Sequence, residues 1–171
     1  MFIRFLRSCI LGLLLSALIS TAAESAPVGA ATKESDLTIV RVFTGWREAV
    51  SFKRISEYFT GKENTGGELM VRTRPEERAG CYFLVRVANR GPAAPITLQL
   101  QIIAPTSAKP VTYAFPVDLK AGSTVVNVGL TGADWPDKTS NPVAWKITLL
   151  SPASLPLASA VSYLWEKPVD N

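Results

Sequence analysis

Apolar and polar residues alternate through the middle of the chain, most regularly over residues 96–102 (ITLQLQI). A period of two places every large aliphatic side chain on one face of a strand and the amides on the other. A second apolar run, 80–89, precedes it across the Gly/Pro-rich segment 90–95. This pattern predicts a β-hairpin over 80–105 at the centre of a sheet.

The same pattern of two alternating segments around a turn recurs toward the C-terminus. Alternation over 111–117 and 124–130, around the turn residues 120–122, predicts a second hairpin, and residues 145–149 and 161–165 predict a third. Earlier strands are predicted at 37–43, ending at Thr44 and Gly45, and at 68–73. No strand–helix–strand pattern occurs, so a parallel sheet is disfavoured.

One segment departs from the β pattern. Over residues 50–59, Phe52, Ile55, Tyr58 and Phe59 recur at helical spacing, with Ser51 as a plausible N-cap and Gly61 where a helix would end. We expect a short amphipathic helix that lies over one end of the fold, with an irregular strand as the alternative.

These elements predict an all-β fold over residues 37–168. It is a two-layer antiparallel β-sandwich of about eight strands, with one short helix near the N-terminal third. The predicted core comprises Phe83, Val85, Val87, Ile96, Leu98, Leu100, Ile102, Phe115, Val126, Val128, Trp145, Ile147, Leu149 and Tyr163.

The hairpin series from 80 to 165 resembles, at the level of class, the immunoglobulin- and fibronectin-III-like sandwiches of bacterial exported proteins. The Cys–Trp–Cys pattern of antibody domains is absent. A resemblance of architecture implies no activity.

The first 23 residues predict a cleavable signal peptide, because Arg4 and Arg7 precede an uncharged apolar run and then small residues. The apolar run is too short for a permanent membrane span. We expect a secreted or periplasmic protein that meets the membrane only through the signal peptide before cleavage. Residues 24–36 predict a flexible lead-in.

Processing also changes the charge and the cysteine count. Without Arg4 and Arg7, 16 basic side chains remain against 14 acidic ones, a net charge of +2, and we expect no nucleic-acid partner. Cys81 is then the single cysteine, which we expect to be a buried thiol because it lies in the densest apolar strand.

The chain contains no histidine, which excludes histidine bases, Ser-His-Asp triads and histidine-ligated metals. We therefore expect no enzyme, no cofactor and no metal. There are two alternatives: carboxylate catalysis at Glu76 and Glu77, and a calcium site at Asp134 and Asp137. The simpler interpretation is that both pairs lie in solvated turns.

Two surface features are candidate ligand sites. Trp46 and Trp135 lie in Gly- or Pro-rich surroundings, where they could stack on sugars, although plugging the ends of the sandwich is favoured. Arg72 and Arg74, predicted to share a strand face, and Arg78 gather near Glu57, Glu76 and Glu77. An internal ion-pair network is favoured there over a site for an anion or acidic glycan.

We therefore predict a non-enzymatic exported β-sandwich module with a structural or protein-binding role. Its partner would be another envelope protein or a glycan. The alternatives are a carbohydrate-binding module that uses the loop tryptophans and a hydrolase that uses carboxylates alone. A ligand surface, if present, is expected where residues 50–59 meet residues 72–78.

Overall fold

The computed structural model describes residues 36–165, all of which belong to one compact unit, Glu34–Asn171. The predicted signal peptide and residues 24–35 of the lead-in lie outside the described residues. Eight strands, two 3-10 turns and one α-helix follow in the order β1 (Leu37–Arg47), η1 (Ala49–Phe52), α1 (Ile55–Thr60), β2 (Leu69–Arg72), β3 (Gly80–Asn89), β4 (Ala94–Ile103), β5 (Val111–Leu119), β6 (Gly122–Thr131), η2 (Gly132–Asp134), β7 (Ala144–Leu150) and β8 (Pro156–Val161). Within this range, no helix is long and apolar enough to cross a membrane.

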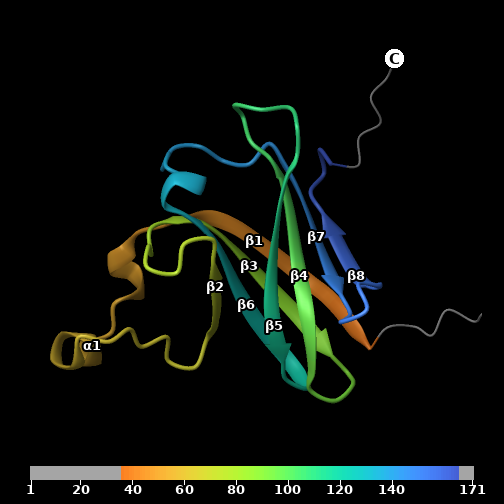
Figure 1. The fold of residues 1–171 in the computed structure, drawn as a ribbon, viewed down its shortest axis with the longest axis horizontal. Helices are drawn as coiled ribbons and strands as arrows, with labels where there is room; N and C mark the ends of the chain where they lie inside the picture. The colour runs from red at the N-terminus through yellow and green to blue at the C-terminus, as the bar shows by residue number, and fades with distance from the viewer. Residues whose placement is uncertain (1–35, 166–171) are drawn as a thin grey trace, which may run out of the picture. The chain divides into compact units, whose positions relative to one another are not determined.

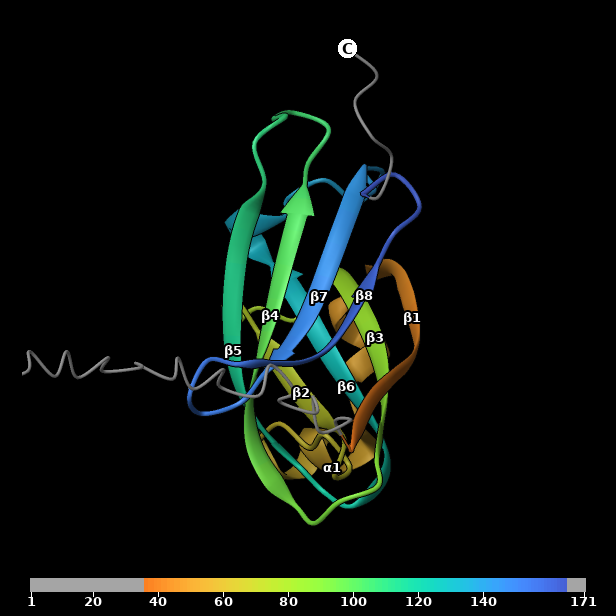
Figure 2. The same ribbon diagram turned by 90° about the vertical axis from the view of Figure 1, so that its right-hand side faces the viewer.

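The strands form two four-stranded sheets that face each other (Figures 1 and 2). The first sheet has the order β1-β3-β6-β2 and the second has the order β5-β4-β7-β8. All but one of the strand pairs are antiparallel, which confirms the predicted all-β sandwich with one short α-helix. The exception is the edge pair of β2 and β6, which is parallel and which the sequence did not predict.

The apolar face of each strand points between the sheets, as the alternation predicted. Twelve of the fourteen predicted core residues are buried. Trp145 is only half-buried against the core. The prediction that Tyr163 belongs to the core is wrong, because β8 ends at Val161 and the ring of Tyr163 is 79% exposed.

Cys81 is buried in β3, as predicted, and its thiol is free. Burial disfavours the thiolate and raises the pKa of this thiol to about 11.

Two of the three predicted hairpins are wrong. In the first predicted hairpin, β3 belongs to the first sheet and β4 to the second. In the second predicted hairpin, β5 belongs to the second sheet and β6 to the first. Both connections therefore cross from one sheet to the other. β7 and β8 do form a hairpin, but β8 shares only Val161 with the predicted strand 161–165. In both arrangements the same side chains face the core, so the alternation cannot tell a hairpin from a crossing.

Asn89, at the end of β3, links the two crossing loops. Its buried amide donates from Nδ2 to the carbonyl of Pro92 at 2.9 Å and to the carbonyl of Lys120 at 3.1 Å. Its Oδ1 accepts from the N–H of Gly91. One side chain thus satisfies backbone groups of both loops that would otherwise be left unpaired beside the core.

The first strand is also longer than predicted. β1 continues through Thr44 and Gly45 to Arg47, and it stays paired with β3 over this length apart from an irregularity between Ile39 and Arg41. The pair Thr44-Gly45 was expected to end the strand. Pairing with β3 outweighs that local preference, because Gly45 lies opposite Tyr82 within the ladder.

Candidate functional site

Residues 48–68 connect β1 to β2, and we call them the insert. They carry η1 and α1 and lie against the outer face of the first sheet, on the side away from the second sheet (Figures 1 and 2). The predicted helix over 50–59 is therefore divided into a 3-10 turn and a separate α-helix. Ser51 caps neither element; its hydroxyl donates to the carbonyl of Glu48 within η1.

The insert rests on a small aromatic cluster outside the main core. Tyr82 of β3 points outward yet is fully buried, because it lies across Gly129 of β6 and beneath Phe52 of the insert. The Tyr82 and Phe52 ring centroids are 4.7 Å apart. A Cβ atom at Gly129 would lie 2.6 Å from the Tyr82 ring, so the absence of a side chain there makes room for the tyrosine.

Arg72 completes this cluster from β2. Its Nε donates to the Tyr82 hydroxyl at 2.9 Å, and its guanidinium lies 5.5 Å from the centre of the Phe52 ring. The Tyr82 hydroxyl in turn donates to the carbonyl of Arg78 at 2.7 Å. Burial opposes the charge on Arg72, but the hydrogen bonds to Glu63 and Tyr82 outweigh it and raise the pKa of Arg72.

Four charged side chains join the insert to β2 and to the connection that follows it. Arg72 binds Glu63 with both terminal nitrogens, at 2.6 and 3.0 Å, and Arg78 binds Glu57 Oε2 at 2.6 Å. The Nε of Arg78 also lies 3.6 Å from Glu63, so the two pairs form one network. The side chains of Arg72 and Glu57 are each only 6% exposed. The predicted association of Arg78 with Glu57 is thus present.

Glu57 organises the insert around itself. Besides the ion pair with Arg78, its Oε1 accepts from the backbone N–H of Arg54 at 3.3 Å and of Asn64 at 3.1 Å. The first contact caps the start of α1, and Gly61, with a φ of 65°, ends the helix where the sequence predicted. The helix is therefore anchored through a carboxylate.

The apolar side chains of α1 face solvent, contrary to prediction. Ile55, Tyr58 and Phe59 are 78%, 69% and 84% exposed, and we call these three residues the tip. The predicted helix would have turned this face onto the sandwich. The ion pair of Glu57 with Arg78 fixes the opposite rotation, in which the side of the helix that carries Glu57 faces the connection between β2 and β3.

The ion pairs predict a response to acid. The hydrogen bond from Arg78, followed by that from the Asn64 N–H, lowers the pKa of Glu57 below its ordinary value of 4.5, and Arg72 does the same for Glu63. Because the folded pKa values are depressed, the stabilisation is fully present above pH 4.5 and is lost as the pH falls through them.

We expect a Glu57→Gln/Glu63→Gln protein to lose less stability than the native protein as the pH is lowered below 4.5. Urea unfolding at a series of pH values measures this. Glu76→Gln/Glu77→Gln removes the same two charges outside the network and should keep the native acid response. Parallel pH profiles for native protein and the Glu57/Glu63 variant would contradict the prediction.

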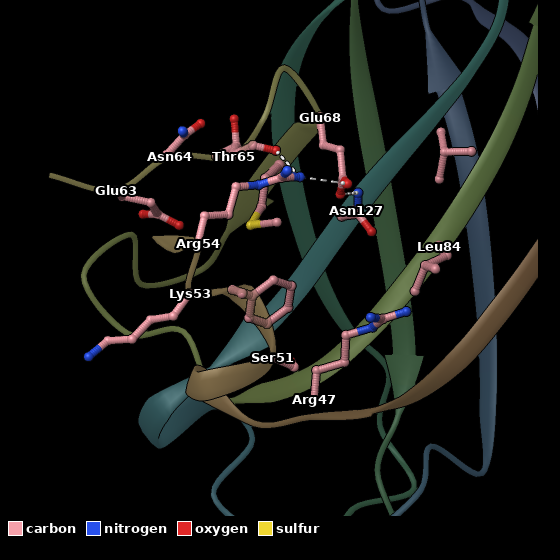
Figure 3. A pocket seen from close by; sticks show the side chains of 13 residues that line it. Arg47, Ser51, Lys53, Arg54, Glu63, Asn64, Thr65, Glu68, Leu84 and Asn127 are labelled. Atoms are coloured by element: carbon pink, nitrogen blue, oxygen red, sulfur yellow. Dashed lines mark hydrogen bonds and ion pairs between the residues drawn. The ribbon is translucent and has the colours of Figure 1, made fainter. Parts of the chain in front are cut away.

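A polar cavity of about 510 Å³ opens beside the network (Figure 3). Arg54 spans its rim, where its Nη2 donates to the Thr65 carbonyl at 3.2 Å and to Glu68 Oε1 at 3.3 Å. The other Glu68 oxygen accepts from Asn127 at 3.4 Å. Arg47 lines the opposite side, and its guanidinium makes no hydrogen bond or ion pair within residues 36–165.

Arg74 does not join this network. β2 ends at Arg72, so Arg74 lies beyond the strand and does not share its face as predicted. The Nε of Arg74 binds Asp134 at 3.2 Å instead. Glu76 and Glu77 form no ion pair within the described part of the chain, and their predicted part in the network is wrong.

The two tryptophans differ in burial. Trp135 is only 4% exposed within the main core, and its Nε1 donates to the Ser140 carbonyl at 3.2 Å. Trp46 of β1 is half-buried against the same core. Its indole nitrogen is buried without a hydrogen bond of normal geometry in the described range, although it contributes weakly to lowering the pKa of nearby Glu48. Trp135 therefore plugs one end of the sandwich, the favoured of the two interpretations.

Three members of the site were not predicted from the sequence. Glu63 lies in a segment, GKENTGG, whose composition is typical of an exposed loop. Tyr82 lies within an apolar strand, where it does not stand out from the core residues, and Phe52 was predicted to be part of the helix. One signal was available for Tyr82: it alternates out of phase with Cys81 and Phe83, so it had to lie on the outer face.

No protein-family model matches this sequence, and no curated protein matches it. Among solved structures, the chain is similar to the crystal structure of an immunoglobulin-like protein from Pseudomonas aeruginosa, with 16% sequence identity and a TM-score of 0.31. The match covers 75% of this chain and 96% of that one. The strand pairing by itself defines the β-sandwich.

Proposed function

We propose that this protein is a non-enzymatic, exported β-sandwich module that binds a component of the cell envelope through the tip of its insert. The observation that carries the proposal is the exposure of Ile55, Tyr58 and Phe59 on one side of α1. Large apolar side chains gathered on one exposed surface are typical of an interaction site in a soluble domain.

The anchoring of α1 supports the same conclusion. Glu57 and its contacts hold the helix in one orientation, and this orientation is the one that presents the tip. Burying a large apolar side chain against a partner stabilises the complex by about 1.5–3 kcal/mol. The free protein gains none of this from the tip, so a partner that covers it gains affinity without any refolding of the sandwich.

The carboxylates of the site do not favour the hydrolase alternative. A general acid at neutral pH needs a raised pKa, whereas those of Glu57 and Glu63 are lowered by their arginine partners. The burial of Trp135 likewise disfavours a sugar-stacking surface at that loop.

Retention by an envelope fraction tests the proposal. We expect residues 24–171, which include the entire compact unit, to be retained by immobilised envelope material, and Ile55→Ser/Tyr58→Ser/Phe59→Ser to abolish this retention while leaving thermal stability near native. The matched control is Val111→Ser/Val143→Ser/Leu155→Ser, which removes three exposed apolar side chains elsewhere.

Loss of retention in the tip variant alone is the expected result. Equal retention of the native protein and the tip variant would overturn the proposed function. Equal loss in the tip and control variants would do so as well, because it would show general stickiness of exposed apolar groups.

A further inference from the structure

The acidic side chains of the insert all have ion-pair partners, whereas two of its lysines have none within residues 36–165. Each of its four carboxylates is ion-paired: Glu48 with Lys138, Glu57 with Arg78, Glu63 with Arg72 and Glu68 with Arg54. Of these four partners, Arg72 extends from β2 and Arg78 from the connection between β2 and β3. The insert therefore presents no uncompensated negative charge.

Two lysines of the insert are left without a carboxylate partner. Lys53 and Lys62 are both exposed and form no ion pair within residues 36–165. They lie on either side of α1 in the chain, Lys53 two residues before it and Lys62 directly after its C-cap, Gly61. Lys53 Nζ lies 5.2 Å from the centre of the Tyr58 ring, so its positive charge adjoins the tip itself.

An apolar tip that is flanked in the chain by two exposed lysines without a carboxylate partner has the chemistry of a membrane-surface contact. Apolar and aromatic side chains enter the boundary between headgroups and acyl chains, while lysine ammonium groups stay at the level of the lipid phosphates. The electrostatic attraction to an anionic surface is worth about 1 kcal/mol for each lysine close to it.

We propose that the tip, with Lys53 and Lys62, docks on an anionic lipid bilayer. This proposal rests on the proposed function and names the partner of that same surface. A stable protein–protein interface buries about 800 Å² on each partner with close shape complementarity. A single helix of six residues, Ile55–Thr60, presents three apolar side chains, too few to form such an interface alone. A fluid bilayer needs no complementary shape.

Vesicle co-sedimentation of residues 24–171 tests the proposal directly. We expect binding to phosphatidylcholine vesicles that contain phosphatidylglycerol, weaker binding to phosphatidylcholine alone, and loss of the difference at high salt. Phe59→Ser should weaken binding to the anionic vesicles by roughly tenfold or more, because the side chain no longer enters the bilayer.

Charge variants provide the second arm. Lys53→Gln and Lys62→Gln should each weaken binding to the anionic vesicles by roughly fivefold and reduce the salt dependence. Lys109→Gln/Lys120→Gln is the matched control, because it removes two exposed lysines from loops of the sandwich away from the insert. It should leave vesicle binding near native.

The outcomes separate the two proposals. Equal vesicle binding by the native, Phe59→Ser and lysine variants, or no vesicle binding at all, overturns the lipid proposal. If envelope retention still depends on the tip in that case, the proposed function stands with a protein or glycan partner. If light scattering instead shows dimers that Phe59→Ser dissolves, the occupant of the tip is a second copy of the chain, and the lipid proposal is overturned.

Discussion

Replacement of Leu100 by alanine is expected to lower the free energy of unfolding by about 2–5 kcal/mol. Leu100 is fully buried in β4, a central strand of the second sheet, between Tyr113 of β5 and Ile147 of β7. The substitution removes apolar surface from the core and leaves a cavity that the paired strands around it cannot close. Urea unfolding of the purified protein measures the loss.

Gln99→Ala is the matched control for this experiment. Gln99 adjoins Leu100 in β4 but points to the outer face of the second sheet, where it is only partly buried. Its replacement should change the free energy of unfolding by no more than about 0.5 kcal/mol. Similar losses for Leu100→Ala and Gln99→Ala would mean that both faces of this sheet are covered.

Tyr82→Ala is expected to cost about 3–5 kcal/mol, although Tyr82 lies outside the main core. Its ring fills the space over Gly129 and supports Phe52, and its hydroxyl joins Arg72 to the Arg78 carbonyl. Alanine would remove the surface on which the insert rests. Urea unfolding gives the stability change, and protease sensitivity of the insert gives its local consequence.

Two further variants separate the contribution of the Tyr82 hydroxyl from that of its ring and control for the loss of an exposed tyrosine. Tyr82→Phe keeps the ring and removes only the hydroxyl, so it should cost about 1–3 kcal/mol through the lost hydrogen bonds. Tyr163→Ala removes an exposed tyrosine ring near the end of β8 and should be nearly neutral. A Tyr82→Ala protein as stable as Tyr163→Ala would refute the cluster under the insert.

The sequence by itself determined the all-β class and, for the central strands, which face is buried. Alternation in β4 assigns Ile96, Leu98, Leu100 and Ile102 to the core, and all four are buried. This inference succeeds because backbone geometry alone makes successive side chains of a strand point to opposite faces, whichever strands lie beside it. The glycine that ends α1, Gly61, was predictable for the same reason, since a left-handed cap is a local requirement.

Tertiary structure decided which strands pair. The connection between β3 and β4 carries the signals of a hairpin loop, yet the strands lie in opposite sheets. Whether a strand turns back beside its predecessor or crosses the core is fixed by contacts between distant residues. Asn89 is an example, because it binds the carbonyl of Lys120 from the other crossing loop. No periodicity records such a contact.

Tertiary structure also decided which side of α1 faces the sandwich. Helical spacing correctly grouped Ile55, Tyr58 and Phe59 on one face, but whether that face is buried depends on which side chains lie next to the helix in the folded chain. The connection between β2 and β3 supplies Arg78, and its ion pair with Glu57, which also accepts from two backbone N–H groups, keeps the side of α1 that carries Glu57 inward. The exposed tip is thus a consequence of an arginine 21 positions away from its partner, a contact that only the folded chain creates.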